Sequence, residues 1–336
     1  MITLIPYSRP SRPKVSVLVA AWNEAEHIEN HICSFLALDY PNKELVLCAG
    51  GTDGTYALAK RWEDGHVTVL EQQPGEGKQR ALRRCLSRSD GAIIHLTDAD
   101  CIFSDEAFRR LIEPIVTGEA LVATGVSEPK RHQRLNRLVQ YQWFNDLWWC
   151  HQLPPIVDGV LGRNCAVLRS VLEEVRAFDT PVRTGTDYFL SRLLARAGHQ
   201  IRSVPDSRIE TEYPDSPRRY MQMWRRWNKN LLVHGTRFAA WNDVRSVLTA
   251  FALYSAILFM PVLTPVLGPL AWLTSLLLFV IANAKRFRRL AAGARLADSR
   301  VTWRFLVSVP FYTLLDMISV ILAIRDSLHP RLRMQW

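Results

Sequence analysis

Charge is missing from one long stretch of this chain. Residues 246–284 contain no Asp, Glu, Lys or Arg, although these four residue types make up 22% of the 336-residue sequence. The stretch is nearly twice as long as the roughly 20 apolar residues that cross a bilayer as one helix. Helix-disrupting residues interrupt it near its middle: Pro261, Pro265, Gly268 and Pro269. We therefore expect a membrane hairpin of two spans, 246–264 and 266–284, and keep a buried soluble hairpin as the alternative.

Metal-binding and disulfide patterns are also missing. The chain has six cysteines but no CxxC pair, and its nine histidines show no metal-ligand spacing. Scattered cysteines of this kind indicate free thiols in a reducing compartment. The cysteines are Cys33, Cys48, Cys85, Cys101, Cys150 and Cys165. The net charge of +10 suits anionic lipids and phosphate-bearing substrates. No nucleic-acid-binding motif accompanies that charge, so we expect no nucleic-acid partner.

No signal peptide is expected at the N-terminus. Pro6, Pro10 and Pro13 disrupt any helix there, and no apolar core follows a basic start. Basic residues instead fill the loop after the hairpin: Lys285, Arg286, Arg288, Arg289, Arg295 and Arg300. Such loops are typical of the cytoplasmic side of a membrane. We therefore predict a multi-pass protein of the cell membrane whose N-terminal domain (1–235) is cytoplasmic and whose membrane domain covers 236–336.

A third apolar run, 305–324, is interrupted only by Asp316. If this run crosses the membrane, the C-terminus lies outside the cell. Arg325, Arg331 and Arg333 argue against that position, so a re-entrant or interfacial segment is the alternative. An aspartate in such a run is costly unless it faces protein or water. We expect Asp316 to bond a neighbouring helix, and weigh a polar conduit as a second role.

The N-terminal half alternates short apolar runs with helix-like segments. Strand patterns cover 15–20, 44–48, 67–70 and 92–96, and helix patterns lie between them, the first from Asn23-Glu24 to Leu38. This alternation predicts an α/β domain with a mostly parallel, doubly wound sheet and helices on both faces.

Polar clusters follow three of these strands. They are Asn23-Glu24, the turn Gly50-Gly51-Thr52-Asp53-Gly54, and Asp98-Ala99-Asp100. Ligands of such sheets bind beyond the carboxyl ends of the strands, so we expect the three clusters to meet in one site. Asp98 and Asp100 would point to the same side of an extended chain. Two such carboxylates suit a hard divalent cation that also takes diphosphate oxygens. Taken alone, however, an Asp-x-Asp pair is a weak signal.

Tryptophan is concentrated in the segment 133–153. Trp143, Trp148 and Trp149 lie in a short, weakly charged, helix-like stretch. Since tryptophan favours the boundary between membrane and water, we predict an interfacial helix there, with an ordinary core helix as the alternative.

The motifs taken in order resemble those of the family 2 inverting glycosyltransferases, which have the GT-A fold. The resemblance extends over about residues 14–235. It is carried by the following segments: Val15–Glu24 ("AYNE"), Asp39-Tyr40-Pro41, Thr52–Thr55, Gly77-Lys78 with Ala81-Leu82, Leu96–Asp100, Gly162–Arg169, Asp187–Leu190 with Arg192-Leu193, Thr211–Pro214, and Arg226-Trp227. The chain is similar in this respect to polysaccharide synthases and to ceramide-glucosyltransferase-like enzymes.

The resemblance implies a role for each matched residue. Asp187 would be the general base that takes the proton of the acceptor hydroxyl. Asp98 and Asp100 would bind Mg²⁺ or Mn²⁺, and Gly162 and Trp227 would contact the acceptor. The remaining matches would bind the nucleotide-sugar donor, expected to be a UDP-sugar: Ala21, Asn23, Glu24, Asp53, Lys78, Asp98 and Arg226.

Taken without the resemblance, several of these residues have plainer interpretations. Asp187 would be the N-cap of a helix, Lys78 a solvated helix charge, and Trp227 an interface or core aromatic. Arg226 would belong to a basic face near lipid headgroups.

The chain also departs from the family pattern. Cys48-Ala49-Gly50-Gly51 stands where many relatives have "DDGS", so the aspartate that holds the nucleobase is missing. Gly185-Thr186-Asp187 replaces "TED", and Arg83 replaces an asparagine. Met223 replaces the glutamine of "QxxRW", which weakens the case for processive polymer synthesis.

The interpretation that fits best is transfer of a sugar to a lipid or glycan acceptor at the cytoplasmic membrane face. Three alternatives stay open. The first is a processive polysaccharide synthase. The second is a sugar transferase acting on polyprenyl phosphate, against which Arg226-Trp227 counts. The third is a nucleotide-sugar-binding membrane protein without catalysis, supported only by the altered motifs.

Overall fold

The computed structural model describes residues 12–329. Pro6 and Pro10 of the expected leaderless N-terminus, and Arg331 and Arg333 of the C-terminal basic group, lie outside that range. The chain divides into two compact units. The first unit comprises Met1–Glu128 and Leu153–Thr211, and the second comprises Pro129–Gln152 and Glu212–Trp336. The domain boundary predicted at residue 235 stays a prediction.

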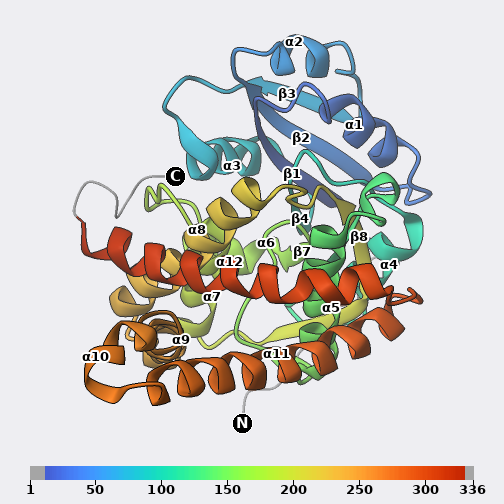
Figure 1. The fold of residues 1–336 in the computed structure, drawn as a ribbon. Helices are drawn as coiled ribbons and strands as arrows, with labels where there is room; N and C mark the ends of the chain where they lie inside the picture. The colour runs from blue at the N-terminus through green and yellow to red at the C-terminus, as the bar shows by residue number, and fades with distance from the viewer. Residues whose placement is uncertain (1–11, 330–336) are drawn as a thin grey trace. The chain divides into compact units, whose positions relative to one another are not determined.

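The first unit is built on a mixed sheet whose strands run in the order β3-β2-β1-β4-β7-β5-β8-β6. The neighbours β3, β2, β1 and β4 are parallel, and β7 is antiparallel to both β4 and β5. The strand bounds are β1 Val15–Trp22, β2 Lys43–Gly50, β3 Val67–Glu71, β4 Ile93–Thr97, β5 Val122–Pro129, β6 Ile156–Val157, β7 Cys165–Leu168 and β8 Ile201–Thr211. The expected doubly wound, mostly parallel sheet is confirmed (Figure 1).

Helices cover both faces of this sheet. One core contains side chains of α1, α2 and α4 with odd-numbered residues of β1, such as Val17 and Val19. The other core contains α3, α6 and α7 with even-numbered Leu18 of the same strand. The helix bounds are α1 Ile28–Leu36, α2 Thr55–Lys60, α3 Gly77–Arg88, α4 Asp105–Val116, α6 Arg169–Glu174 and α7 Thr186–Arg196. Because successive side chains of a strand point to opposite faces, a continuous apolar run such as 15–20 suits a strand buried on both sides.

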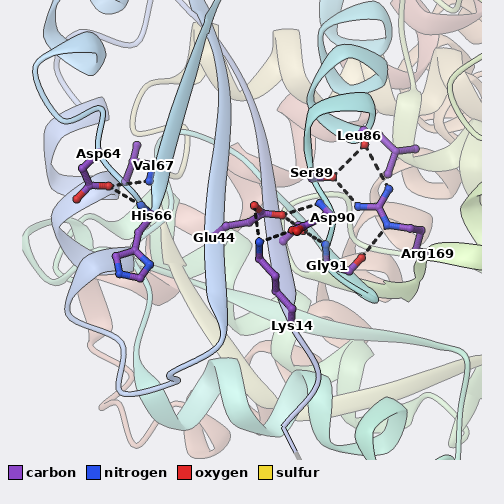
Figure 2. Close-up of polar contacts among 11 residues, drawn as sticks. Lys14, Glu44, Asp64, His66, Val67, Leu86, Ser89, Asp90, Gly91 and Arg169 are labelled. Carbon is purple, nitrogen blue, oxygen red and sulfur yellow. Dashed lines mark hydrogen bonds and ion pairs between the residues drawn. The ribbon is translucent and has the colours of Figure 1, made fainter. Parts of the chain in front are cut away.

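The amino-terminal edge of the sheet is closed by polar contacts (Figure 2). Lys14 Nζ bonds Glu44 at 3.0 Å and also pairs with Asp90. The Arg169 guanidinium donates to the carbonyl oxygen of Gly91 at 2.7 Å and to Ser89 Oγ at 2.7 Å. These side chains bond one another at the edge opposite the carboxyl ends of the strands, where the sequence predicts the site.

The first helix begins later than the sequence predicted. It starts at Ile28 instead of Asn23-Glu24. Asn23 has a φ of 59°, a left-handed conformation that a right-handed helix excludes. The residues between strand and helix therefore form turns, and Asn23 is held at the strand end.

The second unit is helical apart from its share of β5. Its elements are η1 Arg131–Gln133, α5 Arg137–Gln152, α8 Pro217–Arg237, α9 Trp241–Phe259, η2 Met260–Leu263, α10 Thr264–Leu267, α11 Leu270–Leu296 and α12 Trp303–Leu328. Among the described residues, three helical stretches are long and apolar enough to cross a membrane: Trp241–Leu267, Leu270–Leu296 and Trp303–Leu328. The first stretch comprises α9, η2 and α10, and Gly268 and Pro269 separate it from α11, where the sequence predicted the hairpin turn. These helices fit membrane anchoring.

The tryptophan-rich segment forms α5. It packs on α11, where the Cα of Gly293 approaches the backbone of Phe144 so closely that an added Cβ would lie 1.8 Å from the Phe144 carbonyl oxygen. Trp143 is buried, whereas Trp149 is exposed. Arg289 of α11 lies over the Trp148 ring at 4.9 Å. The helix thus has a core face and an outer aromatic end, and its interfacial position stays a prediction.

Candidate functional site

The Asp98–Asp100 segment follows the end of β4 at the carboxyl edge. The strand ends at Thr97, and Ala99 and Asp100 form a turn. The expectation of an extended Asp-x-Asp segment is therefore wrong, because the chain leaves the sheet at Asp98. Both carboxylates are still half-exposed on this short loop.

Several contacts within the first unit hold this loop. Asp100 Oδ2 accepts a hydrogen bond from Thr211 Oγ1 at 3.0 Å, at the end of β8. Thr97 Oγ1 donates to the carbonyl oxygen of Arg163 at 2.9 Å. The ring Nδ1 of buried His31 lies 2.7 Å from the carbonyl oxygen of Cys101, where it can donate. A loop anchored from three sides keeps its carboxylates in a fixed place, as a ligand site requires.

Lys78, Asp98 and Asp187 form a charged group at this edge. Lys78 Nζ pairs with Asp98 Oδ1, and the two side chains are 25% and 34% exposed. Burial by itself lowers the pKa of Lys78, but the Asp98 carboxylate and then Asp187 raise it above its ordinary value, while Arg163 opposes them. Segments far apart in sequence thus bring positive and negative charge together in a position that solvent still reaches.

Asp187 lies in the first turn of α7. The helix has Gly185 as its N-cap, with a φ of 70°, and no side chain caps it. The interpretation of Asp187 as an N-cap is therefore wrong. Gly162 lies against Asp187 so closely that an added Cβ would meet the Asp187 Cβ at 2.8 Å. A side chain at position 162 would displace the carboxylate, which explains on steric grounds why a glycine occupies this position.

The glycine turn after β2 is held by Asn23 and Asp53. Asn23 Oδ1 accepts from the Thr52 N–H at 2.8 Å, and Asp53 Oδ2 accepts from the Ala25 N–H at 3.0 Å. Asp53 is exposed, and although its slight desolvation raises its pKa, hydrogen bonds from Thr55 and from backbone N–H groups hold the pKa below its ordinary value. Asp53 and Asn23 therefore link the turns after β1 and β2, whichever ligand binds there.

The other predicted donor residues differ in accessibility. The Glu24 N–H donates to Thr55 Oγ1 at 2.7 Å, and the Glu24 side chain is half-buried beside the same turn. Ala21 is fully buried among core residues. The structure thus brings Asn23, Glu24 and Asp53 together, while their contact with a nucleoside stays a prediction.

Arg226 and Trp227 belong to the second unit. Both lie on α8 and are half-buried, and the Trp227 ring is 5.8 Å from that of Trp224. Within this unit α8 also carries Arg225, which pairs with Asp326 of α12. The contact of Arg226 with the diphosphate and that of Trp227 with the acceptor stay predictions.

Sequence reasoning missed Arg163 of this site and the burial of Gln79 in α3. Arg163 is close enough to oppose the charge of Lys78, and its place within the Gly162–Arg169 segment was the available signal. Gln79 follows Lys78 in α3 and is 2% exposed, and neither polar atom of its amide has a hydrogen-bond partner among the described residues. Nothing in the sequence distinguishes a buried glutamine in this helix from a solvated one.

The two loop carboxylates fit a divalent cation only if a ligand helps to hold it. Among residues 12–329 no group of three or more His, Cys, Asp or Glu side chains could form a metal site. Mg²⁺ characteristically binds one or two carboxylates together with substrate phosphates and water. Asp98 and Asp100 therefore match a metal site that a diphosphate completes.

Comparison with known proteins places this chain in a family. Residues 13–230 match the family described as "Glycosyltransferase like family 2", which is more than half of the chain. The chain belongs to this family. Its fold is the GT-A fold, with apolar C-terminal helices added.

Relatives with curated names are distant. The poly-beta-1,6-N-acetyl-D-glucosamine synthase of Staphylococcus epidermidis is 24% identical over 198 residues, covering 57% of this chain and 48% of that protein. Glycosyltransferase AglE of Haloferax volcanii is 25% identical over 208 residues, covering 58% of this chain and 65% of that protein. The chain thus spans about half the length of the synthase and under two thirds of AglE.

A solved structure extends the likeness to most of the chain. The mannosyltransferase PcManGT from Pyrobaculum calidifontis, in complex with GDP-Man and Mn²⁺, matches with a TM-score of 0.58 and 22% identity. The match covers 94% of this chain and 87% of that one. At this identity the likeness shows a shared fold.

The two residues that stand in place of the expected "DD" are part of the core. Cys48 and Ala49 occupy the end of β2, and both are fully buried. The Cys48 Sγ lies 3.7 Å from Arg84 Nη1. Neither side chain is a carboxylate, so the missing aspartate is not replaced at this position.

Proposed function

We propose that the protein transfers a sugar from a nucleotide-sugar donor to a lipid or glycan acceptor at the cytoplasmic face of a membrane, with inversion at the anomeric carbon. The observation that carries the proposal is the charged group at the carboxyl edge of the first unit. Lys78, Asp98 and Asp187 come from segments far apart in sequence, and solvent reaches the Lys78–Asp98 pair. Family membership supports sugar transfer as the reaction.

In the proposed mechanism Asp187 is the general base. Its carboxylate accepts the proton of the acceptor hydroxyl while that oxygen attacks the anomeric carbon. The bond between the anomeric carbon and the diphosphate oxygen breaks, and the nucleoside diphosphate leaves with the electron pair. One displacement with one base inverts the anomeric configuration. A positioned base of this kind contributes about 10²- to 10⁴-fold in rate.

The other side chains hold the donor. Lys78 places a positive charge where the diphosphate becomes more negative as the sugar departs. Asp98 and Asp100 would hold Mg²⁺ or Mn²⁺ with the donor, and the bound ion would neutralise charge on the leaving diphosphate. Asn23, Glu24 and Asp53 shape the turns that would face the nucleoside. Arg226 and Trp227 would bind the diphosphate and the acceptor.

A processive polysaccharide synthase is the second candidate. The named function of the Staphylococcus epidermidis relative favours it. Met223 at the position of the glutamine in "QxxRW" favours a single transfer to a lipid or short glycan instead.

The test is a screen of radiolabelled nucleotide sugars in membranes containing the protein, with Mg²⁺ or Mn²⁺, followed by extraction of lipid and polymer. We expect label in the lipid or short-glycan fraction, at least 10²-fold weaker for Asp187→Asn, because an amide cannot accept the proton. Asp179→Asn is the matched control, since Asp179 forms a surface pair with Arg83 at 3.5 Å. Unchanged transfer by Asp187→Asn would refute the assignment of the base. Label in insoluble polymer would favour the synthase.

A further inference from the structure

The third apolar helix, α12, differs from the hairpin in what surrounds it. The protein itself buries 44% of the most apolar 18-residue segment of α12, but only 11% of the corresponding segment in each of the other two candidate spans. Its buried face carries Asp316 and Asp326. A carboxylate in the hydrocarbon of a membrane is costly unless protein groups or water surround it. The partners of these two residues therefore indicate how deep the helix lies.

Asp316 bonds to groups from three other helices of the second unit. Arg286 Nη1 of α11 donates to its Oδ2 at 2.6 Å, and the Tyr141 hydroxyl of α5 donates to the same oxygen at 2.6 Å. The Tyr220 hydroxyl of α8 donates to the other oxygen. The expectation that Asp316 bonds a neighbouring helix is confirmed.

Arg286 fixes the depth of Asp316. It lies in the basic half of α11, next to exposed Lys285 and Arg288. Lys and Arg side chains in such a cluster remain at the level of lipid headgroups or water. Asp316 is 13 positions after Trp303, about 20 Å along the helix axis at 1.5 Å per residue. If α12 crossed the bilayer, Asp316 and its partner would lie deep in the hydrocarbon, which the neighbouring cations forbid.

The C-terminal part of α12 is tied to a cationic helix. Asp326, which is 2% exposed, pairs with Arg225 of α8. Leu232 of α8 packs in the same cluster as Val320 of α12. The helix α8 carries cations along its length and cannot enter hydrocarbon; they are Arg218, Arg219, Arg225, Arg226, Lys229 and Arg237.

The N-terminal end of α12 is polar as well. Exposed Arg304 follows Trp303, and its carbonyl oxygen accepts from Arg137 of α5 at 3.4 Å. Polar partners therefore hold α12 at Arg304, Asp316 and Asp326. A crossing helix would place the first and last of these, about 33 Å apart along the axis, on opposite surfaces of the bilayer. Here α5 bonds both Arg304 and Asp316, and the cation-bearing α8 bonds both Asp316 and Asp326, so α12 follows two helices outside the hydrocarbon along its length.

The opposite side of α12 is an apolar stripe. Trp303, Val307, Phe311 and Ile318 are 69%, 70%, 50% and 41% exposed, at helical spacing on one side. Such a stripe suits the boundary between lipid headgroups and acyl chains, where an amphipathic helix buries its apolar face. The apolar stretches of α9 and α11 belong to the same unit and would supply the anchor.

We propose that α12 lies in the membrane interface and does not cross the bilayer, so that the C-terminus is on the same side as the segment that precedes α9. The hairpin returns the chain to the side from which it left, and α12 keeps it there. The basic residue Arg325 then lies on the side that such residues favour. This inference concerns membrane topology and does not depend on the proposed sugar transfer.

The first experiment locates the C-terminus of the full chain in a bacterial host. Green fluorescent protein, which fluoresces only in the cytoplasm, and alkaline phosphatase, which is active only outside it, are fused in turn after Trp336. We expect a fluorescent fusion and an inactive phosphatase. An active phosphatase with a dark fluorescent-protein fusion would show that α12 crosses the membrane and would overturn the proposal.

The second experiment measures depth along the stripe. Val307→Lys, Phe311→Lys and Ile318→Lys are compared for the amount of protein that remains membrane-integrated after alkaline washing. An interfacial helix tolerates lysine at each position by extending the ammonium group into water, so we expect similar, small losses. Leu276→Lys, on an exposed face of the apolar half of α11, is the matched control and should lose far more. A loss for Phe311→Lys as large as that control would contradict an interfacial α12.

Discussion

The two units of this chain use charge in opposite ways. In the first unit Lys78 and Asp98 pair at an edge where both remain partly exposed. In the second unit Asp316 and Arg286 are 6% and 18% exposed and are enclosed by tyrosine hydroxyls. An exposed pair can exchange its partner for a ligand, whereas an enclosed one holds helices together. The difference separates the residues proposed to act on substrate from those that build the membrane unit.

The enclosed pair predicts the largest effect on stability. Asp316→Ala leaves the Arg286 guanidinium buried without its counter-charge, and such a loss costs about 3–5 kcal/mol. We expect a correspondingly lower thermal midpoint of the purified protein in detergent, measured by loss of helical circular dichroism.

The matched control lies on the surface of the same unit. Asp215 pairs with Arg219 at 3.7 Å, and their side chains are 48% and 74% exposed. Asp215→Ala should cost about 1 kcal/mol or less. Equal effects of the two substitutions would show that the distinction between enclosed and exposed charge is wrong.

The next effect tests position without changing any charge. Gly162→Ala brings a methyl group within 2.8 Å of the Asp187 Cβ and displaces the carboxylate. A misplacement of about 1 Å costs about 10²-fold in rate, so kcat of sugar transfer should fall by that order while the fold is retained.

Gly159→Ala controls for the loss of a glycine in the same segment. Its added Cβ would meet only Ser191 Oγ, at an ordinary distance of 3.7 Å. We expect little change in kcat. If Gly162→Ala transferred sugar as fast as Gly159→Ala, then Asp187 would not be the positioned base.

Much of the first unit could be predicted from the sequence. The strands, the order of their helices and the polar clusters were predictable, because a strand buried on both faces leaves a continuous apolar run such as 15–20. Asp187 and Lys78 were found from motif and register. The left-handed Asn23, which delays α1 to Ile28, was not, since asparagine fits both a helix start and a turn.

Long-range pairing was the part that sequence could not supply. The aspartate at 316 signalled an unusual helix, but nothing in the sequence identified Arg286, Tyr141 and Tyr220 as its partners. A hydropathy average shows 305–324 as one apolar run and does not distinguish residues on the buried face of the helix from those on its exposed face. The same limit applies to Gln79, whose burial depends on how α3 packs on the sheet.

The smallest predicted effect concerns the exposed pair itself. Lys78→Met removes the cation proposed to face the diphosphate, and Asp98 remains accessible to solvent and to a metal ion. We expect KM for the nucleotide sugar to rise about tenfold, equivalent to about 1.4 kcal/mol of lost binding, with little change in thermal midpoint.

Arg83→Met is the matched control, because Arg83 is an exposed cation on the same helix, α3, and pairs at the surface with Asp179. Its KM should stay near that of the unaltered protein. If Lys78→Met instead lowered the thermal midpoint as much as Asp316→Ala and left KM unchanged, the Lys78–Asp98 pair would be structural. The charges of the two units would then serve the same purpose, and the site would have to be sought elsewhere on the carboxyl edge.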